Sequence, residues 1–437
     1  MNATLIPPPG IASCPIPERV LMGPGPSDMH PRVVAALGHS AIGHLDPAFV
    51  AMMEEIKLLL RYAFQTGNAL TFAVSGPGSV GMETCFVNLV EPGDKVIVCR
   101  NGVFGGRMIE NVQRFGGTAV VVEDAWGEPV DPRKVAEALK ANPDARIVAF
   151  VHAETSTGAQ SDAAALIRLA RDAGALSIVD TVTSLGGTPV LADAWGADAI
   201  YSGSQKCLSC VPGLAPVTFS ERAVERVKAR KQKVPSWFMD LGLVLEYWSA
   251  PGGKRTYHHT APVNSLFALH ESLVMLEEEG LEKAWARHRL HHEALKAGFD
   301  VLGLKFVVRE DARLPQLNAS QRIMLARSLG YLPRVAWFKV VAPSLYPMIR
   351  LPVYAVQHYL RRSHKVELAA DRRQLAVVAH RYHRDIVGQQ VVPQHAVHHR
   401  RLVHHHQRPL QHVLAVPAGY AAVAAFLRVV DQAVYGA

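Results

Sequence analysis

The sequence of 437 residues lacks the features of membrane-spanning and secreted proteins. Its apolar runs are all well short of the roughly 18 residues that a membrane-spanning helix needs. Residues 1–20 have neither a basic start nor an apolar core, so they are expected to form an extended arm and not a signal peptide. The five cysteines make no disulfide framework, which favours reduced thiols. We therefore expect a globular, cytoplasmic protein with no membrane partner.

Acidic residues are scarce in only one part of the chain. Residues 320–437 carry 16 Lys/Arg against 4 Asp/Glu, whereas the first 319 residues carry 30 against 34. The formal charge of +8 therefore comes from the C-terminal stretch, and the main body is slightly acidic. A nucleic-acid partner for the basic stretch would rest on charge alone, so we predict none.

Short apolar runs alternate with helical patterns in the main body. The runs predict strands at 70–75, 95–99, 118–123, 146–151, 175–180, 197–202 and 214–220. Helices are expected at 82–90, 106–115, 132–140 and 163–173, the last two after the caps Asp131 and Asp162. This pattern predicts an α/β fold with a largely parallel sheet covered on both faces, whose ligands bind beyond the carboxyl ends of the strands. From Pro262 the pattern is purely helical and predicts a long helix that leads into a second domain.

A glycine pattern, Gly76-x-Gly78-x-x-Gly81, lies between a strand and a helix. Glycines let a backbone approach a phosphate, and a helix N-terminus supplies N–H donors. A dinucleotide site would also want an acidic residue at the end of the next strand, where Arg100 and Asn101 stand. Plain turn chemistry and a dinucleotide site stay open, and we favour a phosphate cradle for another cofactor.

Two polar residues follow other apolar strands. Asp180 alone predicts a helix cap or a buried, hydrogen-bonded carboxylate, and Lys206 alone predicts a surface lysine. Together with a phosphate cradle they form the set that pyridoxal phosphate requires. That cofactor needs a lysine for covalent attachment, a carboxylate that keeps its pyridine nitrogen protonated, and amides that hold its phosphate.

Several motifs, in this order, resemble the class V (fold type I) pyridoxal-phosphate aminotransferases, in the alanine–glyoxylate or serine–glyoxylate branch. They are LMGPGPSDMHPRV, GHLDPAF, VSGPGSVGMET, HAETSTG, VDTVTSLGG, YSGSQKCLSCVPG and TYHHTAPV, and the resemblance spans about residues 17–319. It implies a seven-stranded, mostly parallel sheet in a large domain and a smaller C-terminal domain. The predicted parts are an arm (1–20), the large domain (21–280), the start of the small domain (281–319) and an atypical segment (320–437).

The resemblance also implies the roles of individual residues. Lys206 would bind the cofactor covalently and move the proton at the substrate Cα, and Asp180 would pair with the pyridine nitrogen. The other implied contacts are Gly78, Ser79 and Gln205 at the phosphate, Val182 and Phe104 on the two ring faces, Thr155 near the ring hydroxyl, Gly25 near the substrate, and Tyr257 and Thr260 at the phosphate of a neighbouring subunit. A homodimer follows from the last two.

The implied reaction is a ping-pong transamination between small amino-acid and 2-oxo-acid substrates. An amino group would pass from alanine or serine to glyoxylate, which becomes glycine. The alternative is a protein that keeps the cofactor fold but has impaired or lost turnover.

Other polar and aromatic features are assigned structural roles. Cys207-x-x-Cys210 has metal-like spacing without a second pair, so we predict no metal. His258 and His259 are expected to be loop residues that support the site. An aromatic-rich span with Trp237, Tyr247 and Trp248 is expected to pack a helix and a dimer interface.

The resemblance stops soon after DARLPQLNA. An arginine in an Arg-Ile-Gly-like context, which would grip the substrate carboxylate, is not found, and the surroundings of Arg350 do not match. Residues 320–437 hold 11 of the 21 histidines and only 4 of the 33 glycines. A metal-binding segment and a basic interaction tail stay open, and we favour a reading-frame shift near residue 320.

Overall fold

The structure is a computed structural model that describes residues 10–17, 21, 23–248, 255–301 and 303–320. The predictions for Arg350 and for 321–437 lie outside these residues, as do most of those for the N-terminal arm. Residues 10–17 have no helix or strand and are exposed. The sheet and every predicted site residue belong to one compact unit, which holds the described residues up to Trp285 and those from Phe306 to Ser320.

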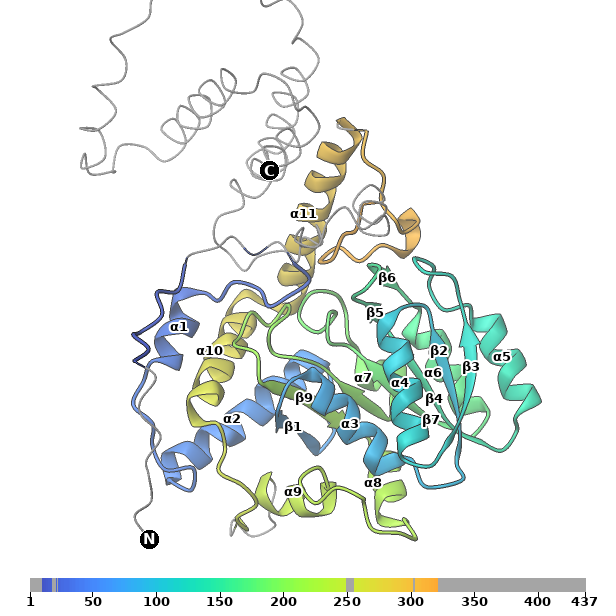
Figure 1. The fold of residues 1–437 in the computed structure, drawn as a ribbon, viewed down its shortest axis with the longest axis horizontal. Coiled ribbons are helices and arrows are strands. Elements are labelled where there is room, and N and C mark those ends of the chain that lie inside the picture. Colours follow the sequence, from blue (N-terminus) through green and yellow to red (C-terminus); the bar gives the residue numbers. More distant parts are fainter. Residues whose placement is uncertain (1–9, 18–20, 22, 249–254, 302, 321–437) are drawn as a thin grey trace, which may run out of the picture. The chain divides into compact units, whose positions relative to one another are not determined.

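A seven-stranded sheet forms the centre of this unit (Figure 1). Its strands, in spatial order, are β1 (Leu70–Ser75), β9 (Leu214–Phe219), β8 (Ala199–Tyr201), β7 (Leu176–Asp180), β4 (Ala145–Val151), β2 (Lys95–Arg100) and β3 (Thr118–Glu123). The pairs from β8 to β3 are parallel, and β9 runs antiparallel to both β1 and β8. The predicted α/β class, with a mostly parallel sheet, is confirmed. All seven predicted strands are present, and the short hairpin β5 (Ala153–Glu154) and β6 (Ala159–Gln160) was not predicted.

The described helices range from 4 to 21 residues in length. They are α1 (Pro31–Leu37), α2 (Pro47–Phe64), α3 (Gly78–Leu89), α4 (Val103–Arg114), α5 (Pro132–Ala141), α6 (Ala163–Asp172), α7 (Ala192–Trp195), α8 (Glu221–Lys228), α9 (Leu241–Trp248), α10 (Val263–Glu279) and α11 (Leu281–Val301), with a 3-10 turn at Glu310–Ala312. Helix α3 contacts β8 and β9, and α4 contacts β2 and β3. Among the described helices, none has both the length and the apolar character that crossing a bilayer requires.

The helix starts show where local sequence signals succeed and fail. Asp131 and Asp162 cap α5 and α6 as predicted, accepting from the N–H groups of Arg133 and Ala165. Helices α3 and α4 begin three or four residues earlier than predicted. Their first turns contain glycines, which add nothing to the hydrophobic periodicity. The periodicity therefore indicated where the buried face of each helix begins, and not where the helix itself begins.

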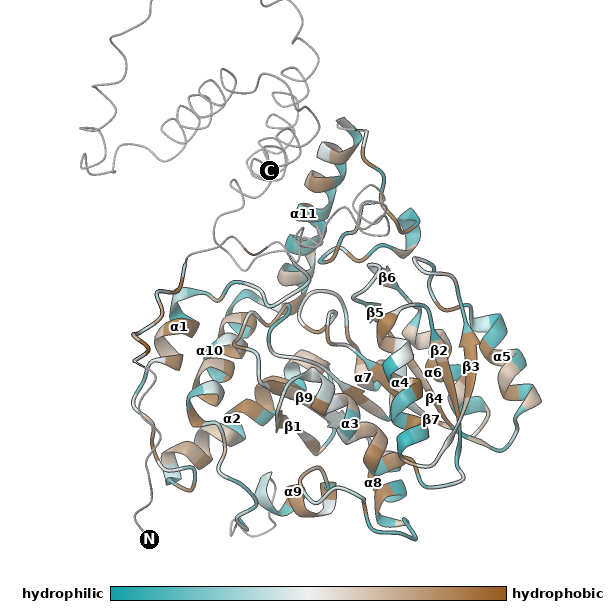
Figure 2. Ribbon diagram, in the orientation of Figure 1, coloured by the Kyte–Doolittle hydropathy of each residue, from teal (hydrophilic) through white to brown (hydrophobic). Residues whose placement is uncertain are grey.

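The central strands are buried on both faces. Residues of β2, β4, β7 and β9 are almost entirely buried, as expected for a sheet covered on both faces. Figure 2 shows the same contrast, with hydrophobic strands and with α4 and α5 mixing hydrophilic and hydrophobic residues. The polar residues that follow these strands are therefore held at the edge of a rigid scaffold.

Candidate active site

The predicted residues gather at one edge of the sheet. Strands β1 and β8 are both antiparallel to β9, so they share a direction with each other and with the parallel strands β7, β4, β2 and β3. The segments that follow β1, β2, β4, β7 and β8 therefore leave the sheet at the same edge. This is where open α/β sheets bind their ligands.

The glycine pattern forms the turn from β1 into α3. A Cβ on Gly76 would lie 2.7 Å from Val80 Cγ2, one on Gly78 would lie 3.2 Å from Val182 Cγ2, and one on Gly81 would lie 2.9 Å from Ala215 Cβ. The glycines thus let the helix start close to the sheet. Gly78 and Ser79 stand in the first turn of α3, where N–H groups have no acceptor within the helix and can bind an anion.

Asp180 is a buried carboxylate at the end of β7. Its Oδ1 accepts a hydrogen bond from the Val182 N–H, and its Oδ2 accepts one from the Tyr201 hydroxyl, both at 2.8 Å. Asp180 and Tyr201 are direct neighbours across β7 and β8, which explains the second bond. Burial raises the pKa of Asp180 to about 7, with these hydrogen bonds acting in the opposite direction. A cationic partner would therefore stabilise the ionised form.

Lys206 is buried in the turn after β8, with 7% of its surface exposed. Its Nζ donates to the carbonyl of Pro24, and its own carbonyl accepts from Ser27 Oγ at 2.8 Å. Burial lowers the pKa of Lys206, against the opposing charges of Cys207 and Asp180. The amine is therefore closer to neutrality than an ordinary lysine, as a nucleophile or proton carrier requires.

Gly25 lies directly against the Lys206 side chain. A Cβ at Gly25 would stand 2.7 Å from Lys206 Cδ and 2.8 Å from Nζ, and the φ angle of +126° also favours glycine. The Ser27 N–H donates to the Gln205 carbonyl at 3.0 Å, which holds the N-terminal segment at the lysine turn. The structure thus brings the predicted substrate residue Gly25 next to the predicted catalytic lysine.

The other predicted contacts lie on neighbouring elements. Phe104 is in the first turn of α4, and Val182 follows Asp180. Thr155 Oγ1 shares a hydrogen bond with Thr183 Oγ1. Gln205 Oε1 is buried and has no hydrogen-bond partner among the described residues.

Tyr257 and Thr260 are not linked to this set. Their hydroxyl groups are 3.3 Å apart, and Tyr257 is 58% exposed. No hydrogen bond or ion pair recorded for the described residues joins either one to Lys206 or Asp180. Their predicted role in a neighbouring subunit stays a prediction.

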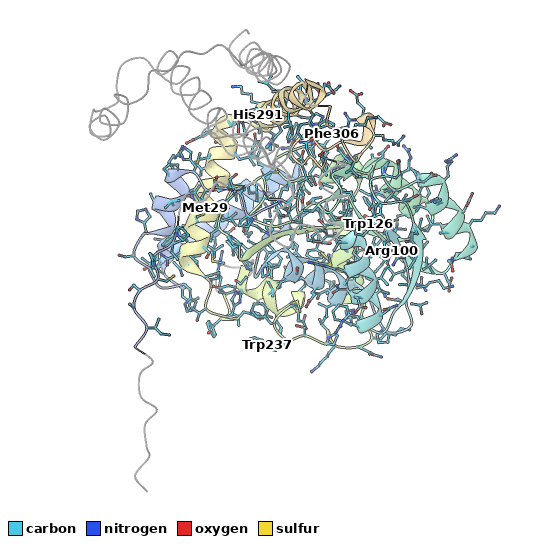
Figure 3. The ribbon with its side chains drawn as sticks, turned by 45° about the horizontal axis from the view of Figure 1, so that its top comes forward. Met29, Arg100, Trp126, Trp237, His291 and Phe306 are labelled. Atoms are coloured by element: carbon cyan, nitrogen blue, oxygen red, sulfur yellow. The ribbon has the colours of Figure 1, made fainter. Side chains whose placement is uncertain are left out.

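His258 and His259, which lie between Tyr257 and Thr260 in the sequence, connect to the glycine turn. His259 Nε2 is 2.8 Å from Ser75 Oγ, at the end of β1, and His259 Nδ1 is 2.8 Å from His258 Nδ1. The His258 ring stacks on Trp237, with centroids 4.5 Å apart. Trp237 itself is 63% exposed and lies at the periphery of the view in Figure 3.

The two cysteines near Lys206, Cys207 and Cys210, are partly or fully buried. Cys210 is buried, and Cys207 Sγ donates to the Thr183 carbonyl at 3.4 Å. In the part of the chain that the structure describes, no group of three or more His, Cys, Asp or Glu side chains could hold a metal ion.

Sequence reasoning missed Tyr201 and Glu154. Tyr201 is an internal strand residue, and only the register of β7 and β8 shows that it meets Asp180. Glu154 stands next to Thr155 in HAETSTG, is fully buried, and accepts from the Phe104 N–H at 3.3 Å. The absence of any capping side chain before α4 was a signal that could have pointed to it.

Known proteins resemble this chain in sequence and in fold. Residues 27–318 match the family model described as aminotransferase class-V. The chain is 42% identical to the alanine–glyoxylate aminotransferase of Oryctolagus cuniculus over 303 residues, which are 69% of this chain and 77% of that protein.

Two solved structures extend the likeness. The alanine–glyoxylate aminotransferase of a Nostoc species superposes with a TM-score of 0.69 and 45% identity, over 71% of this chain and 81% of the other. The ureidoglycine–glyoxylate aminotransferase of Bacillus subtilis superposes with a TM-score of 0.74 and 31% identity, over 85% of this chain and all of the other. The family match, the sequence identity and the fold agree, and the chain belongs to the class V aminotransferases.

Proposed function

We propose that this chain binds pyridoxal phosphate and transfers an amino group from a small amino acid to glyoxylate. The observation that carries the proposal is a pair of buried residues on adjacent strands: Asp180 is the last residue of β7, and Lys206 lies in the turn after β8. Relatives named alanine–glyoxylate aminotransferase support glyoxylate as the acceptor. Alanine or serine is the proposed donor, and the cytoplasm is the proposed compartment.

The residues of the candidate site fit pyridoxal phosphate. Gly78 and Ser79 offer free helix N–H groups to a phosphate. The Gln205 side chain, which follows β8, carries an amide NH₂ group that would donate to the same phosphate. The carboxylate of Asp180 can hold a proton on a ring nitrogen. Phe104 and Val182 would cover the two faces of the ring, and Thr155 would lie near its hydroxyl.

Pyridoxal phosphate, when bound, supplies an electron sink for the Cα–H bond of the amino acid and accepts its amino group. Lys206 Nζ would move the proton between the substrate Cα and C4′ of the cofactor, because its lowered pKa makes the free amine accessible. Asp180, held by Val182 and Tyr201, keeps the ring nitrogen protonated. The donor leaves as a 2-oxo acid before glyoxylate collects the amino group.

We propose a homodimer in which Tyr257 and Thr260 reach the phosphate of the partner. The exposure of Tyr257 and the adjacent hydroxyl of Thr260 support this assignment.

Borohydride reduction followed by peptide mapping tests the cofactor assignment. Reduction with pyridoxal phosphate is expected to modify Lys206 and to leave Lys57 unmodified, although both are 7% exposed, because Lys57 is held by Glu54 and the Trp248 carbonyl. Lys206→Ala should lose the modification and all turnover of alanine or serine with glyoxylate, whereas Cys207→Ala should keep both. Modification of another lysine at full turnover would refute the assignment.

A specific observation favours the second candidate, a cofactor-binding protein with weak or no turnover. The family match ends at residue 318, and the composition changes at residue 320. Normal cofactor attachment without turnover would support this candidate. For the proposed frameshift, which concerns residues outside the described ones, the gene should be translated beyond Asn318 in the other two frames. The absence of an Arg-Ile-Gly-like segment from both would refute it.

A further inference from the structure

The N-terminus of α4 takes its hydrogen-bond acceptors from another part of the chain. The residue before the helix is Gly102, which has no side chain to cap it. The Val103 N–H instead donates to Ser156 Oγ at 3.1 Å, and the Phe104 N–H donates to Glu154 Oε2 at 3.3 Å. Both acceptors belong to the segment that follows β4, about 50 residues away in the sequence. The first turn of α4 is therefore fixed to a neighbouring strand end.

Glu154 is the centre of this connection. Its Oε1 accepts from the N–H of Ser156 at 2.8 Å and from the hydroxyl of Ser156 at 2.6 Å, and the side chain is fully buried. At least three donors thus converge on its two oxygens. These donors and the positive end of α4 offset the cost of burying a carboxylate.

The glycine before α4 is required by this arrangement. A Cβ at Gly102 would lie 2.4 Å from Glu154 Cδ and 2.4 Å from Ser156 Oγ. The φ angle of 176° is extended backbone, so the requirement is one of space and not of conformation. The carboxylate occupies the volume that any other residue at position 102 would need.

We propose that Glu154 is a positioning residue that, as a carboxylate, fixes the first turn of α4 and thereby the ring of Phe104 over the cofactor site. Thr155, the residue expected near the ring hydroxyl, is its direct neighbour. The charge of Glu154 also acts on Asp180, since it is among the influences that raise the pKa of that carboxyl. The effect on the cofactor rests on the proposed function, whereas the capping of α4 does not.

Replacing Glu154 by glutamine removes the negative charge and one acceptor oxygen while keeping the size of the side chain. An amide has one acceptor oxygen, so it cannot serve both the two Ser156 donors and the Phe104 N–H. If the oxygen faces Ser156, the amide NH₂ faces the Phe104 N–H, and two donors meet. Glu154→Gln should therefore release the first turn of α4 while adding no bulk.

Hydrogen exchange of the chain without cofactor tests the cap. In Glu154→Gln, peptides that contain Val103 and Phe104 should exchange roughly tenfold faster or more. Asp198→Asn is the matched control, because Asp198 is also buried and also accepts from a backbone N–H and a hydroxyl, at Ser177 and Ser220, but at the amino end of β8. Asp198→Asn should leave those peptides unchanged. Unchanged exchange in Glu154→Gln would overturn the proposal.

A double-mutant cycle tests the effect on Phe104. Glu154→Gln should weaken the binding of pyridoxal phosphate, followed by absorbance, roughly tenfold. In a Phe104→Ala background the same change should have little effect, because the ring that Glu154 positions is gone. An equal loss in both backgrounds would overturn the positioning role. No binding by the unsubstituted chain would instead refute the proposed function, and hydrogen exchange would still decide the role of Glu154.

Discussion

Replacing Gly25 by alanine tests whether the position of Lys206 controls the reaction. The added Cβ would lie 2.7 Å from Lys206 Cδ and 2.8 Å from Nζ, whereas nonbonded carbon atoms prefer about 3.5–4.0 Å. The end of the lysine must therefore move by about 1 Å. A displacement of about 1 Å at a reacting group can cost roughly 100-fold in rate. We expect turnover with alanine and glyoxylate to fall by about that factor.

A matched glycine separates this effect from backbone strain. Gly280 also has a positive φ, +83°, but a Cβ there would meet no atom within 4 Å. Both alanine variants should lose about 1–3 kcal/mol of unfolding free energy in denaturant titrations, since both place a side chain in a disfavoured backbone conformation. Only Gly25→Ala should show the roughly 100-fold fall in turnover. Equal turnover in the two variants would refute the reasoning.

The remaining predictions concern Asp180, Tyr201 and the dimer. Asp180→Asn should bind pyridoxal phosphate but turn over far more slowly, and near-normal rates would show that another group protonates the ring. Without cofactor, the folded state raises the pKa of Asp180 from 3.8 to about 7, so it binds the proton more tightly than the unfolded state does. The unfolding free energy of the unsubstituted chain, relative to that of Asp180→Asn, should therefore fall as the pH rises between these values. A difference that does not change with pH would contradict this. Tyr201→Phe removes a hydrogen bond that lowers the pKa of Asp180, so this decline should extend to higher pH, whereas Tyr247→Phe, at another buried tyrosine, should not shift it. Mixing inactive Lys206→Ala and Tyr257→Phe subunits should restore some activity if sites are shared, and no gain would count against shared sites.

The sheet could be predicted from sequence because burial on both faces leaves a local signal. Strand β1 is almost entirely buried and appears as a largely apolar run of the observed length. The edge strand β3 also has the observed length, but only Val122 in it is buried. The starts of α3 and α4 could not be placed, because their glycines are selected by contacts with residues far along the chain, such as Val182 and Glu154. Hydrophobic periodicity predicts the buried face of a helix, but it does not predict a first turn that lies at a binding site.

Lys206 and Asp180 could be proposed from the sequence, because pyridoxal phosphate demands a particular residue type at each of the two places. The residues that hold these groups were not predictable, because their roles depend on register and on close approach. Tyr201 meets Asp180 only because β7 and β8 are paired with those two residues opposite each other. Glu154 acts on a helix that begins about 50 residues before it.

The attachment of the N-terminal segment to Lys206 has a consequence for how the protein is made. Ser27 and Lys206 are separated by 179 positions, yet the Ser27 hydroxyl donates to the Lys206 carbonyl. During synthesis the first residues leave the ribosome long before the lysine turn exists, and contacts of such long range form late because loop closure comes first. Until then Pro24–Ser27 have no lysine turn to bind. Completion of the lysine turn would therefore both finish the site and fix Pro24–Ser27 in place.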